Sequence, residues 1–149
     1  MANDEKSVRV FEGIDGIKQI YLDTLSLPPE STIYAFLSPD SVHPDIYSWL
    51  TTEYVIKRKE KKLFAHVFVT SDIPSTNIAA YTAKDADEYR QTHIIPTEKT
   101  AFSCEIDIYG DKVAMINYNP NGKIMGVIID HPMIVQTIKS LYLHYYWKL

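Results

Sequence analysis

The chain has 149 residues, a formal net charge of −4 at pH 7 and 46% of its residues in the hydrophobic set AVILMFWYC. This length and composition predict one folded domain with a sizeable core and exclude a disordered chain, while the acidic balance argues against a non-specific nucleic-acid-binding protein. No apolar run approaches the ~20 residues that cross a bilayer, the N-terminus is polar and the single cysteine excludes an internal disulfide, so we expect a cytoplasmic protein with no membrane partner.

In the N-terminal half, apolar residues recur twice at helical spacing, and a short apolar run follows each of these segments. Residues 57–62 are mostly basic and are interpreted as the solvated end of the second helix, where Arg58 and Lys62 could also meet an anion. A polar stretch before Pro96 is expected to form an exposed helix. The predicted elements are a helix over Gly13–Leu27, a strand over Thr32–Leu37, a helix through Ile46, Leu50 and Tyr54, a strand over Leu63–Val69 and a helix over Ala83–Thr92.

From Ala101 the apolar period changes to two, which is typical of a strand with one buried and one wet face. Turn residues then divide the chain into short apolar runs, which predicts an antiparallel meander. The face expected to be buried carries Phe102, Cys104, Ile106 and Ile108, and the face expected to be wet carries Ser103, Glu105, Asp107 and Tyr109. The predicted elements that follow are strands over Lys112–Tyr118 and Ile124–Ile129 and a final helix over Met133–Leu149.

The order of these elements is α-β-α-β-α-β-β-β-α. Strands joined through helices favour parallel pairing in the first half, and tight turns favour antiparallel pairing in the second. We therefore expect an α/β fold in which a mixed five-stranded sheet is flanked by helices.

The sequence contains no motif for a metal site, a phosphate loop or an activated nucleophile. The five histidines lack the spacing of zinc ligands, and no glycine-rich phosphate loop or nucleophile elbow is present, so neither a metal nor a cofactor is expected. His66, within a predicted strand, is interpreted as a core or edge histidine. Cys104 is interpreted as an inert buried thiol.

Three acidic residues are the strongest candidates for chemistry. Glu105 and Asp107 are two apart and project from one face of a strand, and Asp111 lies just beyond them. They could bind a cation or act in acid–base chemistry. Alternatively, they could simply form the wet face of a half-exposed antiparallel sheet.

Three segments together resemble the effector domain of TrmB-type transcriptional regulators. Val10–Lys18 is similar to the EG-x-x-G-I segment that opens this domain, and Glu88–Pro96 is similar to the family's approach to the meander. The strongest likeness lies at the end of the chain, and the resemblance covers nearly all residues from Val8 onward. The segments that carry it there are Ile106–Ala114, Gly126–Ile129 and a terminal helix that reaches Trp147.

This resemblance implies a sensor domain that is similar to one half of a phospholipase-D-like fold. Such a domain would bind a small-molecule effector, often a sugar, and would form a homodimer. In the family a winged helix reads DNA, and the seven residues before Val8 are too few for one, so DNA is expected to be bound only through a domain outside this chain. Residues 1–7 are expected to be disordered or added by cloning, and residues 8–149 to form the sensor domain.

Phospholipase-D-like enzymes use a His-x-Lys-x4-Asp motif, and no His-x-Lys occurs in this sequence. If Asp111 took the place of the motif's aspartate, Cys104 and Ile106 would stand where the histidine and lysine are required. An isoleucine cannot hold phosphate, so the resemblance implies a domain without catalytic activity.

The effector site is expected beside the sheet, where the first two strands end and the polar face of the meander points outward. Two other functions stay open: an interaction module that binds through the terminal helix without a small molecule, and a small hydrolase that uses Glu105, Asp107 or His66. The candidate ligand-binding residues are Ser38, Ser71, Asp72, Ser103, Glu105, Asp107 and Asn117. The candidate interface residues are Tyr142, Tyr146 and Leu149.

Overall fold

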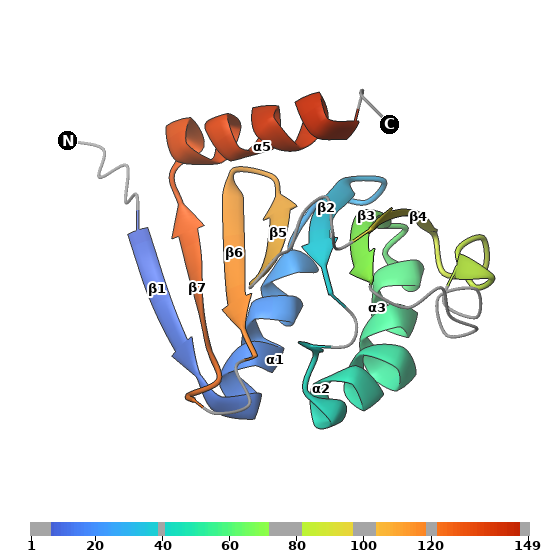
Figure 1. Cartoon of the computed structure of the whole chain (residues 1–149), viewed down its shortest axis with the longest axis horizontal. Helices are drawn as coiled ribbons and strands as arrows, with labels where there is room; N and C mark the ends of the chain where they lie inside the picture. Colours follow the sequence, from blue (N-terminus) through green and yellow to red (C-terminus); the bar gives the residue numbers. More distant parts are fainter. Residues whose placement is uncertain (1–6, 39–40, 72–81, 97–103, 119–121, 147–149) are drawn as a thin grey trace.

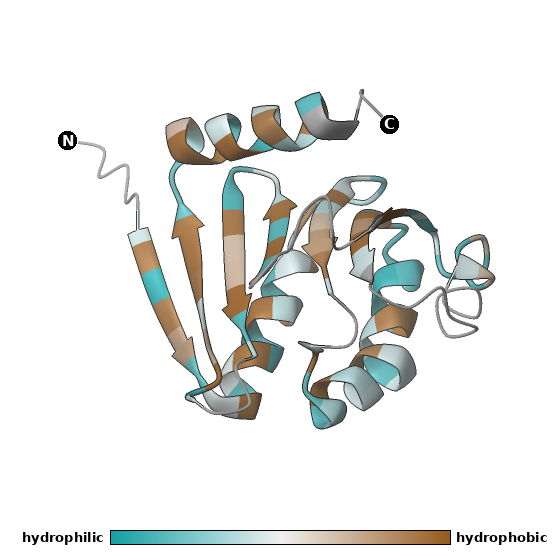
Figure 2. Cartoon of the chain, viewed as in Figure 1, coloured by the Kyte–Doolittle hydropathy of each residue, from teal (hydrophilic) through white to brown (hydrophobic). Residues whose placement is uncertain are grey.

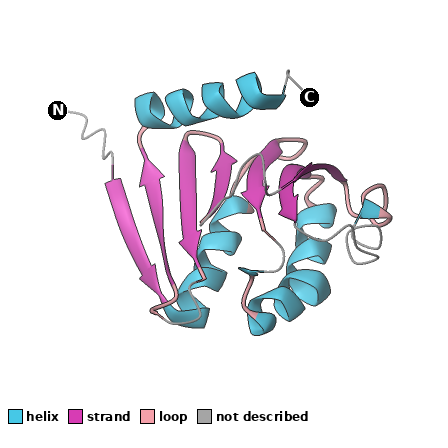
Figure 3. Cartoon of the chain, in the orientation of Figure 1, coloured by secondary structure: helices cyan, strands magenta, loops and turns pink. Residues whose placement is uncertain are grey.

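The computed structural model describes residues 7–38, 41–71, 82–96, 104–118 and 122–146. Figure 3 shows strands and helices following one another along the chain. The elements are β1 (Ser7–Glu12), α1 (Gly13–Thr24), β2 (Thr32–Leu37), α2 (Pro44–Trp49), the π-helical segment η2 (Leu50–Tyr54), α3 (Val55–Glu60), β3 (Phe64–Ser71), β4 (Arg90–Pro96), β5 (Glu105–Tyr109), β6 (Lys112–Asn117), β7 (Met125–Asp130) and α5 (Pro132–Tyr146).

The strands form one mixed seven-stranded sheet in the order β1-β7-β6-β5-β2-β3-β4 (Figure 1). β2, β3 and β4 are parallel to one another, as expected for strands joined through helices or long connections. β5, β6, β7 and β1 are antiparallel, and β5 joins the two halves by pairing antiparallel with β2. The predicted change from parallel to antiparallel pairing is therefore present in the sheet.

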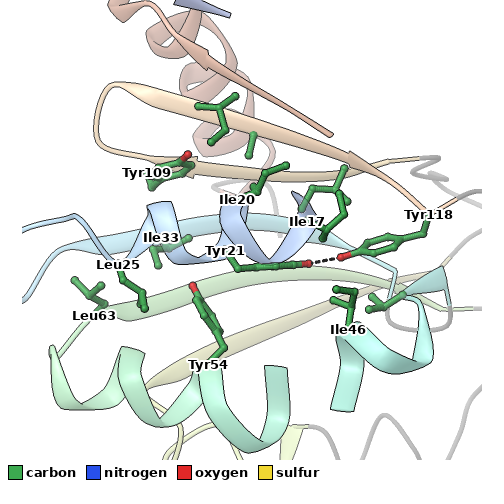
Figure 4. Close-up of a cluster of buried hydrophobic side chains, with 14 residues drawn as sticks. Ile17, Ile20, Tyr21, Leu25, Ile33, Ile46, Tyr54, Leu63, Tyr109 and Tyr118 are labelled. Atoms are coloured by element: carbon green, nitrogen blue, oxygen red, sulfur yellow. Dashed lines mark hydrogen bonds between the residues drawn. The ribbon is translucent and has the colours of Figure 1, made fainter. Parts of the chain in front are cut away.

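Helices cover both faces of the sheet. On one face, α1 and the α2-η2-α3 segment enclose a core that includes Ile17, Ile20 and Ile46 (Figure 4). On the other face, α5 packs over a second core through Val135 and Tyr142. Figure 2 shows apolar residues along the strands and a mixture of apolar and hydrophilic residues on the helices. Because both faces are covered, alternate residues of the central strands are buried in both directions.

α1 lies unusually close to β7. A Cβ atom placed on Gly126 would lie 2.4 Å from Ile20 Cδ1 and 3.0 Å from the backbone oxygen of Met115. The chain enters α1 through Gly13, whose φ of +72° favours glycine and whose N–H donates to Ile124 O over 2.9 Å. These contacts fix α1 against the antiparallel half of the sheet.

The helical stretch from Pro44 to Glu60 is interrupted by η2. A π-helical turn inserts one extra residue and rotates the side chains that follow it. Tyr54, the last residue of η2, is buried against α1, and its OH lies 2.5 Å from Thr24 Oγ1. The predicted helix through Ile46, Leu50 and Tyr54 is confirmed, with this local change in its winding.

Two strands of the sheet were not predicted. β1 includes Ser7, which was expected outside the fold, and pairs with β7. β4 replaces the C-terminal part of the helix predicted over Ala83–Thr92, and that prediction is wrong. The polar residues there bind each other, since Asp85 accepts hydrogen bonds from Arg90 Nε over 2.8 Å and from Thr92 N over 2.9 Å. These contacts turn the chain into an edge strand.

The predicted faces of β5 also need correction. Glu105, Asp107 and Tyr109, which were expected in solvent, are buried under α1, whereas Cys104, which was expected in the core, is exposed. The alternation itself is correct, and Ile108 does face a core under α5. The error arises because the meander is covered on both faces.

Two further residues that were expected to be exposed are buried. Arg58, expected in a solvated basic run, is only 3% exposed and donates hydrogen bonds to the backbone oxygens of Leu63, Glu88 and Tyr89. Tyr142, expected in an exposed interface stripe, lies on the inner side of α5 and is completely buried against the sheet. Leu149 lies outside the described residues, as does the side chain of Tyr146.

Within the described parts of the chain, none of the helices has both the length and the apolar character needed to cross a bilayer.

Replacement of Gly126 by alanine should lower the free energy of unfolding by about 1–3 kcal/mol, because the new methyl group would overlap Ile20 and meet a backbone oxygen that cannot move aside. Urea denaturation followed by circular dichroism measures this change. Ser140→Ala, on the exposed side of α5, is the control and should change stability by less than about 0.5 kcal/mol. An unchanged Gly126→Ala protein would contradict the close packing of α1 on β7.

Tyr142→Phe should destabilise the protein by about 0.5–1.5 kcal/mol, because it removes the hydrogen bond that the Tyr142 OH donates to the buried His66 backbone oxygen over 2.7 Å. Thermal denaturation measures the effect. Since Tyr142 lies in the core, light scattering should give the same mass for both proteins, and a change of mass without loss of stability would restore the interface interpretation.

Candidate functional site

Two acidic side chains lie in the middle of the sheet, beneath the helices. Glu105 is the first residue of β5 and is 6% exposed, and Asp107 follows on the same face and is 4% exposed. The strand places both carboxyl groups toward α1, because side chains two apart point the same way. We call these two residues the carboxyl pair.

Hydroxyl groups from three different elements surround the carboxyl pair. Tyr21, on α1, donates its OH to Glu105 Oε2 over 2.7 Å, and its oxygen lies 2.6 Å from the OH of Tyr118 at the end of β6 (Figure 4). Because Tyr21 uses its proton toward Glu105, Tyr118 is the donor in the second bond. Thr24 and Tyr54 extend the polar group along α1. This network ties the first helix to the meander.

Burial controls the ionisation of the carboxyl pair. Removal from water raises the pKa of Glu105 from its ordinary value of 4.5 to about 7, although the bonds from Tyr21 and Asp107 act in the opposite direction. The pKa of Asp107 is raised further by burial, by the charge of Glu105 and by their mutual hydrogen bond. The pair therefore retains a proton at neutral pH, held mainly by Asp107.

Asp107 is incompletely satisfied. Its Oδ2 atom is buried and has no hydrogen-bond partner among the described residues. The residues opposite Asp107 on the two neighbouring strands are Ala35 of β2 and Ala114 of β6, so small side chains flank the carboxyl group. A buried oxygen without a donor is costly, and its position among small side chains favours a site that an additional donor could complete.

The predicted ligand-binding residues fall into three groups. Glu105 and Asp107 lie together as described. The strand register brings Ser38, Ser71 and Asn117 to the same edge of the sheet, since each lies at or just beyond the end of its strand there. Asn117 lies on the opposite face from the carboxyl pair, because its neighbour Ile116 packs under α1. Asp72 and Ser103 lie outside the described residues.

The tyrosines of this site were not predicted as site residues. Tyr21 lies on the apolar face of the first predicted helix, where it looks like an ordinary core residue, and Tyr118 ends a strand. The available signal was the unusual number of 11 tyrosines in the chain. A tyrosine within an apolar helical face needs a partner for its OH when it is buried, and the carboxyl pair supplies one.

His66 lies apart from the carboxyl pair. It faces α5, where Tyr142 OH lies 3.3 Å from His66 Nδ1, and its ring centroid lies 5.1 Å from that of His93. Burial and the neighbouring His93 lower the pKa of His66. The sheet therefore separates this histidine from Glu105 and Asp107, and the described residues do not assemble the three groups into one hydrolytic site. The interpretation of His66 as a core histidine agrees with its burial.

No protein-family model matches this chain, and no curated protein matches it in sequence. Its fold is similar to that of TrmBL2, an archaeal chromatin protein with a novel mode of DNA binding, with a TM-score of 0.63 and 13% identity. That match covers 99% of this chain and 55% of TrmBL2, so the chain spans about half the length of that relative.

The fold is also similar to Nuc from Salmonella typhimurium, a phospholipase D family member, with a TM-score of 0.62, 15% identity and 95% of both chains covered. NucT from Helicobacter pylori gives a TM-score of 0.58 at 12% identity, covering 94% of this chain and 95% of that one. The predicted α/β, phospholipase-D-like fold is thus confirmed, with seven strands in place of five. At these identities the likeness concerns the fold.

The carboxyl pair should make the protein less stable as pH rises. Because the pKa of Glu105 is about 7 in the folded protein and 4.5 in the unfolded chain, the folded state holds more protons between these values, and stability is lost as pH rises through this window. The loss from Glu105 should reach about 3 kcal/mol between pH 4.5 and 8. Urea titrations at several pH values measure it.

Glu105→Gln should flatten this dependence, because the side chain no longer ionises. Asp111→Asn removes an exposed carboxyl group in the β5–β6 turn and serves as the matched control, which should keep the wild-type slope. A wild-type protein whose stability rises between pH 5 and 8 would contradict this prediction, because it would show that burial does not disfavour the ionised form of the carboxyl pair.

Proposed function

We propose that this chain is a non-catalytic regulatory domain of a TrmB-like transcriptional regulator that senses a small-molecule effector at the edge of the sheet beside the carboxyl pair. The observation that carries the proposal is the unsatisfied carboxyl group of Asp107 at the centre of a fold shared with TrmBL2 over 99% of this chain. DNA contact would belong to a further part of such a regulator, since this chain spans 55% of TrmBL2.

The proposed lack of catalysis is supported by the residues in and beside β5. The sequence holds no His-x-Lys pair, and Cys104 and Ile106 stand at the two places that precede Asp111 by the spacing of the phospholipase D motif. Ile106 packs against the core under α5, where it supplies neither a charge nor a hydrogen-bond donor. Transfer of a phosphoryl group needs side chains that stabilise its negative charge. Cys104 and Ile106 do not provide such side chains at the positions of the motif's histidine and lysine.

The sensing role is supported by the tyrosine hydroxyls and carboxyl groups gathered between β5 and α1. Carboxylates and tyrosine hydroxyls bind donor-rich ligands, and tyrosine rings pack on their apolar faces. Tyr21 connects the carboxyl pair to α1, and α1 follows directly from the strand at the N-terminal end of the domain. A ligand that changes the Tyr21–Glu105 bond would therefore act on α1 and β1, which is a route from effector site to neighbouring domain.

An interaction module is the second candidate, and an exposed apolar group favours it. Met133 and Leu141 on α5 are 67% and 66% exposed, and Val8 and Val10 are exposed on the edge strand β1. Such side chains are typical of contacts between subunits. A homodimer formed through this surface is compatible with effector sensing, so the two candidates differ in whether a small molecule binds.

A thermal-shift screen against sugars, sugar phosphates, amino sugars and amines, with light scattering in parallel, tests the proposal. A ligand present at 100 times its dissociation constant should add about 2.7 kcal/mol of stability and raise the melting temperature by several degrees. Asp107→Asn should weaken the response to that ligand, and Asp111→Asn should not. The protein should not hydrolyse bis(p-nitrophenyl) phosphate.

A flat screen together with a stable dimer would contradict effector sensing and favour the interaction module. Hydrolysis of the phosphodiester that is lost in Asp107→Asn would contradict the non-catalytic role.

A further inference from the structure

Among the described residues, no basic side chain forms an ion pair with the carboxyl pair. In the described part of the chain, the side chains of Glu105 and Asp107 hydrogen-bond to the Tyr21 hydroxyl and to each other. Lys18, on the same helix as Tyr21, holds its ammonium group 5.7 Å from the Trp49 ring centroid instead. Buried acids are normally paired with a base, so this arrangement is unusual.

The carboxyl pair can still accept a hydrogen bond from a donor group. Glu105 accepts the Tyr21 hydroxyl, and the pair shares one proton, which leaves Asp107 Oδ2 as a buried acceptor without a donor. Asp107 is 96% buried, since its exposed fraction is 4%, and the side chains beside it across the sheet are Ala35 and Ala114. A group that enters here must bring N–H or O–H donors, whereas an anion would meet two acidic side chains.

We propose that the carboxyl pair is the binding site for the ammonium or guanidinium group of a cationic effector. This inference rests on the proposed sensing function and specifies its ligand class. The cation would supply both the missing donor at Asp107 Oδ2 and the missing positive charge. The ring of Tyr21, whose OH contacts Glu105, packs with the rings of Tyr54 and Trp49 at centroid distances of 5.5 to 6.2 Å. Aromatic rings beside a carboxylate are well suited to an organic cation.

Proton displacement gives the site a defined pH dependence. The empty pair holds a proton that an ammonium group must replace, so the ligand and the proton compete for the same two carboxyl groups. If one proton leaves for each cation bound, affinity should rise by up to about tenfold per pH unit below neutrality and level off above the pKa of the pair. A neutral ligand bound by hydrogen bonds would lack this increase.

The test uses matched probes that differ in charge on the same ring: glucosamine, glucose and glucose 6-phosphate, and cyclohexylammonium and cyclohexanol. Affinities are measured by isothermal titration calorimetry in phosphate buffer between pH 6 and pH 8. At least one ammonium probe should bind tenfold or more tightly than its neutral partner, and glucose 6-phosphate should bind most weakly in its series. The affinity of cyclohexylammonium, which stays charged throughout, should increase with pH over this range.

Asp107→Asn should reduce the affinity for that ammonium probe at least tenfold and remove much of the pH dependence, whereas Asp111→Asn, the exposed control, should leave both unchanged. Asparagine has nearly the shape of aspartate and donates to Glu105 as the protonated acid does, so the variant should fold.

The outcomes separate this inference from the proposed function. Binding of neutral sugars alone, or of anions, would leave a sensor but overturn a cationic site. Binding of an ammonium probe that is equal in wild type and Asp107→Asn, or that does not change with pH, would place the cation elsewhere and overturn it as well. Failure of both ammonium probes overturns the inference directly, whatever the wider screen shows for sensing.

Discussion

The enclosure of two carboxyl groups between a sheet and a helix is the constraint on which the rest of the structure depends. Isolated acids in a core cost too much energy to be tolerated, so Glu105 and Asp107 require a shared proton and donors from outside their own strand. Tyr21 of α1 donates to Glu105, and Tyr118, just after β6, donates to Tyr21. The packing of α1 on the sheet, through the close approach at Gly126, then becomes a condition for satisfying the acids.

The same requirement relates the fold to its proposed role. A core of aliphatic residues under α1 would offer no hydrogen-bonding group to a ligand. Asp107, whose Oδ2 has no partner among the described residues, can instead be stabilised by a ligand that donates a hydrogen bond. The shared phospholipase-D-like fold places β5 at the junction of the parallel and antiparallel strands. In this chain that central strand carries an acidic pair on the α1 face and apolar side chains on the α5 face.

Local sequence patterns predicted most of the helices and strands, but they did not predict which of their faces are buried. The strand over Thr32–Leu37 agrees with the sequence prediction residue for residue, because a β-branched and aromatic run bounded by turn residues depends on its own sequence. The helix predicted over Ala83–Thr92 failed because Arg90 and Asp85 bind one another in the folded chain. Alternation identified which side chains share a face with Glu105, but only the position of α1 decides whether that face is wet.

The order of the strands also has a consequence for how the chain acquires its fold. β1 precedes the other described strands in the sequence, but it pairs with β7. Val10 therefore cannot form its pair with Val127 until β7 has been synthesised. Long-range pairing of this kind slows folding, since a large loop must close before the contact forms. During synthesis the exposed Val8 and Val10 would belong to an unpaired strand for most of the chain's length. The edge strand β1 is thus open to mispairing with other chains before the sheet is complete.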